Sequence, residues 1–293
     1  MRELRGDLRN IPGARPLGSW RCCGALSRPR EARFRAFGLG AYNGDMDARS
    51  GQRRVLAIET SSARGSVALG EGPHLLAVSD LATTSQHCQL LMPTIDNLCM
   101  RQGWDPKTLD EIHVSAGPGS FTGLRIAVTV AKALAISLRL RVVAVPTLDV
   151  IAARAEELAD PPPNLGVALD AKRKQVFGAV YRLQAGRYRP LAEACLLSPA
   201  GLLARTPQPR WLTGEGLTYH AEAFRAADTP WVPEEHRWPR AEEVHRLGWE
   251  MAAAGCYTDP ERLLPIYVRI PEAEERWSLR HGGMSHRKRP SRP

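Results

Sequence analysis

The feature that most constrains this chain is the glycine-rich block at residues 117–126, which reads Gly-Pro-Gly-Ser-Phe-Thr-Gly-Leu-Arg-Ile. It follows a strand-like apolar run at 112–116 and opens a long apolar segment that ends at Leu138. Glycine permits φ > 0 and a close approach of other groups, and the free N–H groups of a helix start lie at the same point. The block therefore predicts a strand, a tight turn and a helix. It matches neither a P-loop, which needs Gly-Lys-Ser/Thr, nor a Rossmann turn.

The charge of the chain is concentrated at its two ends. The formal net charge is +9, yet residues 55–271 hold 22 Lys/Arg against 23 Asp/Glu. A neutral core of this kind has no basic stripe for nucleic acid. We expect residues 1–53 to be a disordered basic extension, and 272–293 to be a basic C-terminal tail. Translation from Met46 is the favoured explanation of the extension, and a transit peptide is the alternative.

Cysteine usage and apolar run length indicate the compartment. The six cysteines show no CxxC pair and no disulfide-framework spacing, which is typical of reduced thiols in a cytoplasmic protein. The longest apolar run, 126–138, is interrupted by Lys132 and is shorter than a bilayer span. We therefore expect no membrane segment.

Strand and helix patterns divide the chain into two α/β lobes, 54–160 and 161–271, joined by the proline-rich linker 160–164. In the first lobe we expect strands at 54–60, 66–69, 75–78, 111–116 and 142–145, with helices at 86–101, at about 124–138 and from Thr147 to about Leu158. In the second we expect strands at 165–170, 175–181, 190–197 and 211–213, helices from Ser198, near 217–226 and at 240–254, and a docked terminal segment at 265–269.

The helix predicted at 124–138 is apolar on nearly every face, with Arg125 and Lys132 as its charged residues. A helix without a polar face must be covered on two sides. Either it is sandwiched within its own lobe, or one side meets another protein.

Three separated blocks together resemble the TsaB (YeaZ) family over roughly residues 54–270. They are Leu-Ala-Ile-Glu-Thr-Ser at 56–61, the glycine-rich block, and Ala-Leu-Asp-Ala-Lys-Arg at 168–173 with Val-Phe-Gly-Ala-Val-Tyr at 176–181. The resemblance implies a two-lobed actin/hexokinase/Hsp70-like ATPase (ribonuclease H-like) fold. It also implies a part in making threonylcarbamoyladenosine in tRNA, as partner of the catalytic paralogue TsaD and the ATPase TsaE.

ATPases of this fold need an acid and hydroxyls at the first hairpin, a second acid and a glycine-rich adenosine turn. Vestigial nucleotide or phosphate contacts would be Glu59, Thr60 and Ser61 at the hairpin, Gly117 and Gly119 at the turn, and Asp170 as second acid. A carboxylate at a strand end more often caps a neighbouring turn, and we favour that interpretation slightly for Glu59 and weigh it equally for Asp170. The short, polar Gly214–Gly216 segment is a poor adenosine turn.

Other chemistry finds little support in the sequence. The paralogue holds a metal with two histidines four residues apart, whereas here His87 has Leu91 at that offset, so we expect no metal site. Ser120 lies outside a Gly-x-Ser-x-Gly elbow, and its hydroxyl and that of Thr122 are expected to cap the helix start. We expect no catalytic residue in this chain.

Two hypotheses from different classes follow. The favoured one is a non-catalytic subunit that binds a TsaD-like enzyme, or a second copy of itself when alone, through Leu90, Met92, Val130 and Leu134. It would need no cofactor of its own, because ATP and Mg²⁺ would bind the partner subunits, and it would meet tRNA through the complex. The alternative is an ATP-using acyl or phosphoryl transferase with its site at Glu59, Ser61, Asp170 and 117–123. A weaker third option is tRNA binding by the basic tails.

Overall fold

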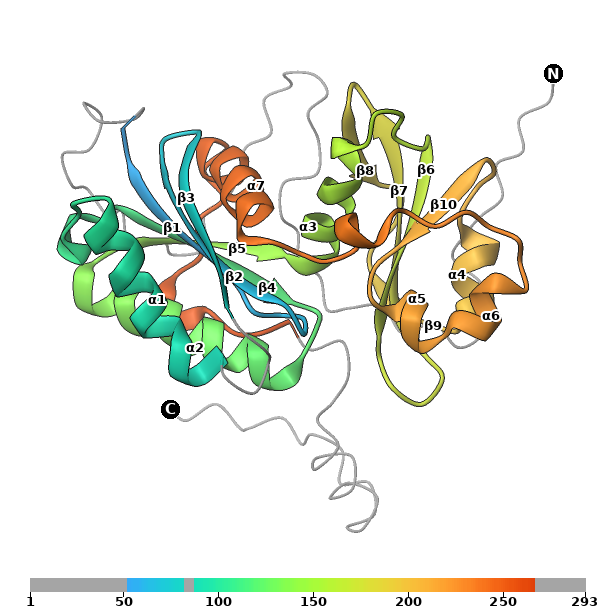
Figure 1. The fold of residues 1–293 in the computed structure, drawn as a ribbon, viewed down its shortest axis with the longest axis horizontal. Helices are drawn as coiled ribbons and strands as arrows, with labels where there is room; N and C mark the ends of the chain where they lie inside the picture. The colour runs from blue at the N-terminus through green and yellow to red at the C-terminus, as the bar shows by residue number, and fades with distance from the viewer. Residues whose placement is uncertain (1–51, 82–86, 267–293) are drawn as a thin grey trace, which may run out of the picture.

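The computed structural model describes residues 52–81 and 87–266 and shows two β-sheets side by side, each covered by helices (Figure 1). The first sheet has the strand order β3-β2-β1-β4-β5. Its strands are β1 (Arg54–Glu59), β2 (Gly65–Glu71), β3 (His74–Leu81), β4 (Glu111–Gly117) and β5 (Arg141–Pro146). The first three, which the sequence predicts as consecutive strands, form an antiparallel meander, and β4 and β5 continue the sheet in parallel.

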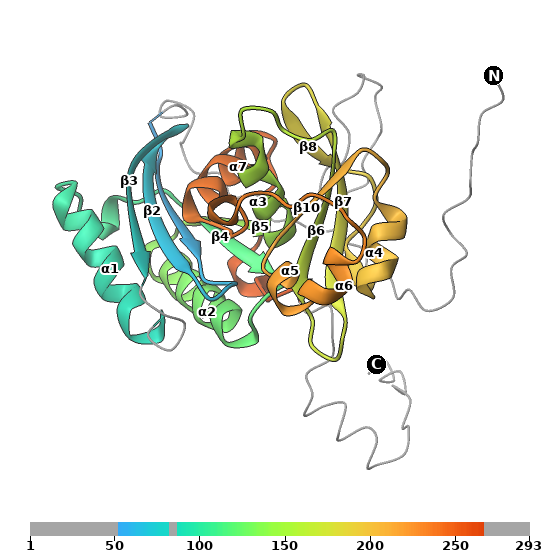
Figure 2. The ribbon, with the colours of Figure 1, turned by 45° about the vertical axis from the view of Figure 1, so that its right-hand side comes forward.

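Alternating side chains on the first sheet build two separate cores. Leu56 and Ile58 of β1 join a core with helices α1 (His87–Arg101) and α2 (Phe121–Leu138), whereas Ala57 between them joins a core with α7 (Ala241–Ala253). This is the period of two that a strand imposes. Figures 1 and 2 show α1 and α2 next to each other on one face of the sheet and α7 on the other.

Helix α2 is the long apolar helix that the sequence predicts. The Ser120 side chain accepts a hydrogen bond from the Gly123 N–H, and Arg139 ends the helix in the left-handed conformation. By length and composition alone α2 could cross a membrane, but a third of it is buried in the protein, and it covers the sheet as a core helix does. The rest of its surface is the part that a partner could cover.

The second lobe has a sheet with the order β10-β6-β7-β8, and β9 pairs with β7. Its strands are β6 (Asn164–Asp170), β7 (Val176–Gln184), β8 (Arg187–Pro190), β9 (Cys195–Leu197) and β10 (Arg210–Thr213). Helices α4 (Pro199–Arg205), α5 (Gly216–Tyr219) and α6 (Ala221–Arg225) cover one face, and α3 (Thr147–Arg154) covers the other. The single helix predicted near 217–226 is thus two short helices that meet at His220.

The path of the chain differs from the expected division at residue 160. Helix α7 lies within the range assigned to the second lobe, yet it packs against β1, β2, β4 and β5 of the first sheet. The stretch that includes Ile266 returns to the first lobe as well, where its N–H donates to the Ala116 carbonyl 2.7 Å away. The boundary therefore separates the two sheets but not the helices that cover them. Residues 1–51 of the predicted extension, the tail and residues 267–269 lie outside the described residues. The end of the extension is ordered, contrary to the prediction, because the Arg53 guanidinium pairs with Glu111 of β4 at 2.6 Å.

Ion pairs join the lobes where α3, α7 and β8 meet. The Glu156 carboxylate accepts hydrogen bonds from Arg187 of β8 and Arg246 of α7, each at 2.9 Å. The Tyr181 hydroxyl of β7 donates to Asp149 of α3 at 2.6 Å. Glu156 thus links α7, which packs on the first sheet, to β8 of the second sheet, and the Tyr181 hydroxyl holds α3 on the second sheet.

Candidate functional site

The first candidate residues lie at the end of β1, where the chain turns into β2. Glu59 is fully buried, and its Oε1 accepts hydrogen bonds from the backbone N–H and the hydroxyl of Ser61, both at 2.5 Å. Burial raises the pKa of Glu59, although hydrogen bonds from the Ser115 side chain and from Ser61 oppose the shift. One carboxylate oxygen thus closes its own turn, as the sequence favours, and the carboxylate also interacts with Ser115 of β4.

The glycine-rich turn packs directly onto this hairpin. The Ser120 N–H donates to the Ser61 carbonyl, and the Thr60 hydroxyl donates to the Gly123 carbonyl, both at 2.7 Å. A Cβ on Gly119 would overlap the Ser61 carbonyl, and one on Gly123 would overlap the carbonyl of Thr60. These two glycines therefore allow the close approach of the protein's own hairpin backbone.

Two further positions of the block have distinct roles. Gly117 has φ of +114°, and a Cβ there would lie 2.9 Å from the Ile266 carbonyl oxygen, so this glycine serves the turn and the docked chain. The expected cap at Ser120 is confirmed, whereas the Thr122 side chain is exposed in the first turn of α2.

Asp170 lies at the end of β6 in the second lobe and is engaged by its neighbours. Its carboxylate accepts from the Lys172 backbone N–H at 3.0 Å and lies 2.7 Å from the Lys172 Nζ and 3.1 Å from the His220 Nε2. Burial opposes the shift, but the hydrogen bonds from Lys172 and His220 lower the pKa of Asp170. Asp170 is therefore a turn former that also holds a cation.

Glu215 is an acid of this region that the sequence did not single out. It lies between Gly214 and Gly216 in the second lobe, and its carboxylate accepts a hydrogen bond from the Ala63 backbone in the β1–β2 hairpin of the first. Burial, together with the nearby charge of Asp170, raises the pKa of Glu215 to about 7. The signal in the sequence was an acid flanked by two glycines, but nothing local indicated that it would reach the other lobe.

The raised pKa of Glu215 predicts how the stability of the protein depends on pH. Between its ordinary pKa of 4.5 and about 7, folded Glu215 keeps a proton that the unfolded chain has released. The contribution of Glu215 to the free energy of unfolding is therefore fully present below pH 4.5 and is lost as pH rises through 7. We expect Glu215→Gln, which can still accept from Ala63, to raise Tm at pH 8 and to leave it unchanged at pH 4.5. Thermal unfolding of both proteins across this range checks it, and a variant that gains nothing at pH 8 would contradict it.

The candidate site residues do not fit ATP with Mg²⁺. Gly119 and Gly123 are filled by the hairpin backbone, and a Cβ on Gly214 or Gly216 would meet the Ala168 carbonyl. Within 52–81 and 87–266, no group of three or more His, Cys, Asp or Glu side chains could hold a metal. The Glu59 carboxylate already interacts with Ser61 and Ser115, and it supplies neither a phosphate cradle nor an adenosine turn. We therefore derive no nucleotide chemistry from this site.

The residues predicted to face a partner lie on α1 and α2. Leu90, Val130 and Leu134 are partly buried and pack against the first-lobe core, and Met92 is 38% exposed. Val130 and Leu134 are four residues apart and share one stripe of α2. Leu90 and Met92 are two apart, about 200° around the helix, so they lie on different sides of α1. Other apolar side chains of the pair are also exposed: Met100, Phe121 and Ile136.

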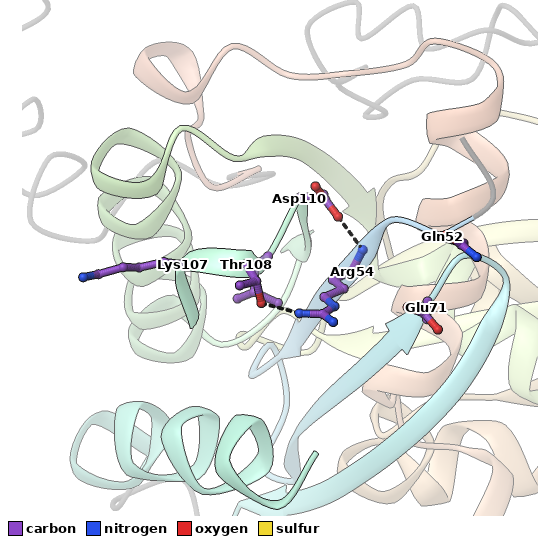
Figure 3. A pocket seen from close by; sticks show the side chains of 7 residues that line it. Gln52, Arg54, Glu71, Lys107, Thr108 and Asp110 are labelled. Atoms are coloured by element: carbon purple, nitrogen blue, oxygen red, sulfur yellow. Dashed lines mark hydrogen bonds between the residues drawn. The ribbon is translucent and has the colours of Figure 1, made fainter. Parts of the chain in front are cut away.

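A shallow pocket of about 540 Å³ lies at the opposite end of β1, away from the candidate residues. Its lining is mostly polar: Gln52, Arg54, Glu71, Lys107, Thr108, Leu109 and Asp110. Figure 3 shows Arg54 between Thr108 and Asp110. The Arg54 Nη1 donates to the Thr108 hydroxyl at 2.6 Å and its backbone N–H to Asp110 at 2.7 Å. These groups already satisfy each other, so the pocket adds no candidate chemistry.

The two α/β lobes, with α7 returning to cover the first sheet, define a protein of the actin/hexokinase-like class. A YeaZ protein from Pseudomonas aeruginosa has the same fold, with a TM-score of 0.62 and 29% identity, and the match covers 73% of this chain and 100% of that one. The predicted fold class is thereby confirmed.

Sequence comparison identifies the family. The TsaD family, described as tRNA N6-adenosine threonylcarbamoyltransferase, matches residues 81–231. The TsaB protein of Bacillus subtilis (strain 168) is 30% identical over 230 residues, covering 76% of this chain and 97% of that one. The Escherichia coli (strain K12) TsaB protein is 27% identical over 220 residues, covering 74% and 94%. The chain belongs to the TsaB (YeaZ) family.

Proposed function

We propose that this protein acts in tRNA threonylcarbamoyladenosine biosynthesis as a non-catalytic subunit that binds and supports a TsaD-like threonylcarbamoyltransferase. The observation that carries the proposal is the contrast between two surfaces. The glycines of the candidate turns are packed against the backbone of their own lobe, whereas α1 and α2 leave apolar side chains exposed. The relatives named for this biosynthesis match the chain over nearly their full length.

A partner built on the same fold suits the exposed helix pair. The TsaD family matches just over half of this chain, so a TsaD-like enzyme offers a related lobe with its own two helices. Packing one pair against the other gives a four-helix interface, and the same surface would pair two copies of this chain when the partner is absent. A TsaE-like ATPase is proposed as the third component, and the complex is proposed to work in the cytoplasm, where its tRNA is found.

Copurification with a TsaD homologue tests the proposal. We expect a dimer when the protein is alone, exchange into a heterodimer on mixing, and loss of modification when this subunit is omitted from a reconstituted assay. Failure to co-elute with the TsaD homologue would refute the proposal. Calorimetry with ATP·Mg²⁺ on the isolated chain tests the alternative enzyme, because micromolar binding would favour a transferase acting alone.

Substitution of Glu59 distinguishes the non-catalytic subunit from a transferase that acts alone. We expect Glu59→Ala to leave partner binding and tRNA modification nearly intact, since the carboxylate bonds to its own hairpin. Its removal leaves the buried Ser61 donors unpaired, so stability should fall by about 1–3 kcal/mol. Chemical denaturation and the modification assay measure the two effects. Glu59→Gln, which keeps an acceptor, is the matched control, and loss of modification in both variants with the fold intact would assign Glu59 a chemical role.

A further inference from the structure

The tip of the β6–β7 hairpin has an unusual backbone. Lys172, Arg173 and Lys174 have φ of 60°, 50° and 60°, so three successive residues adopt the left-handed conformation without a glycine among them. For residues with a Cβ this conformation is strained, and it is normally visited by single residues. Hydrogen bonds between Ala171 and Gln175 and between Gln175 and Lys172, both at 3.0 Å, close the turn. The sequence keeps three cations where glycine would relieve strain, and such strain clusters at functional sites.

The side chains of this basic turn, residues 172–174, are exposed beside an aromatic ring. The Lys172 side chain is 77% exposed, and its Nζ lies 2.7 Å from Asp170 and 5.0 Å from the centre of the Tyr219 ring. Tyr219 is 57% exposed at the end of α5. In Figures 1 and 2 the hairpin projects from the second lobe next to α5. Asp170 and Tyr219 thus hold one cation in place at an otherwise exposed tip.

We propose that the basic turn and Tyr219 form a contact for the phosphate backbone of RNA, used when this subunit works in the complex proposed above. Clustered cations bind phosphates, and an exposed ring next to them can stack on a base. The cluster stands out because residues 55–271 are nearly neutral as a whole, with 22 Lys/Arg, three of them in this turn, and 23 Asp/Glu. An acidic protein segment would use the cations but gain less from the ring, so RNA is the favoured occupant. A tip of three residues reaches few phosphates, which suits a contact that assists a complex.

The salt dependence of tRNA binding tests the proposal. In the complex with a TsaD homologue, we expect Arg173→Gln with Lys174→Gln to lower the slope of log K against log salt by about 0.7–0.9 per charge removed. The exposed pair Lys107→Gln with Arg189→Gln, one charge on each lobe, is the matched control and should leave the slope unchanged. Tyr219→Ala should weaken binding without changing the slope.

A second variant separates function from folding. We expect Arg173→Gly to relieve the left-handed strain and raise Tm by about 2–4 °C, while it weakens tRNA binding by the complex. If the wild-type complex binds tRNA and neither the double variant nor Arg173→Gly alters that binding, the proposal fails although the function proposed above stands. If the double variant instead loses a protein component of the complex, the turn is an acidic-partner site and the RNA proposal is overturned. If no complex with the TsaD homologue forms, the proposed function itself fails.

Discussion

Replacing Val130 by aspartate is expected to abolish co-elution with a TsaD homologue and, with it, tRNA modification. Val130 lies on α2 and packs against the core at the base of the helix pair while part of it remains exposed. In a four-helix interface the new carboxylate would be desolvated without a partner, which costs several kcal/mol. Since about 1.4 kcal/mol is a tenfold change in Kd, a loss of about 3 kcal/mol weakens the interface about a hundredfold.

The control is an exposed position away from the helix pair. Ala223 is exposed on α6 of the second lobe. Ala223→Asp adds the same charge and should co-elute normally. Size-exclusion chromatography of both variants with the TsaD homologue, together with their thermal unfolding, reads out binding and folding separately. A folded Val130→Asp protein that still supports modification would place the interface elsewhere, and combined with an essential Glu59 it would mean that this chain carries the chemistry.

Much of the fold could be predicted because local patterns report local structure. The apolar run at 54–60 correctly predicts strand β1, and the Ser120 cap follows from a hydroxyl that precedes a helix. The return of α7 to the first sheet could not be predicted in this way. An amphipathic pattern shows that a helix has a buried face, but it does not show which sheet covers that face.

In the candidate site, too, local contacts could be predicted from the sequence and contacts between distant segments could not. Glu59 and Ser61 bond within two residues of each other, so the turn-capping interpretation could be made from sequence. The contact of Glu215 with Ala63 spans the two lobes and has no local signal. The left-handed turn at 172–174 was equally hidden, because Lys and Arg do not mark positive φ as glycine or asparagine would. Leu90 and Met92 were placed on one surface, yet a separation of two residues puts them on different sides of a helix.

The glycine-rich block supports the second large effect, a loss of stability in Gly123→Ala. A methyl group at this position would overlap the Thr60 carbonyl, which is backbone and cannot rotate away. The start of α2 must then move off the end of β1, and the 2.7 Å hydrogen bond from the Thr60 hydroxyl to the Gly123 carbonyl is lost as well. Overpacking costs about 1–3 kcal/mol and the hydrogen bond about 1 kcal/mol more. We expect Tm to fall by about 5–12 °C, measured by thermal unfolding.

Two controls assign this loss to steric contact at the hairpin. Gly186 has φ of +75° and open space around it, so Gly186→Asn, which tolerates that conformation, should leave Tm nearly unchanged. Thr60→Val removes the hydroxyl without adding a group between the backbones, and it should reproduce only the smaller, hydrogen-bond part of the loss. Because α2 also carries Val130 and Leu134, a shift of its first turn should weaken partner binding in Gly123→Ala even where the protein remains folded. An unchanged Tm in Gly123→Ala would show that the glycine serves something other than this packing, and a ligand contact at the turn would again become the better explanation.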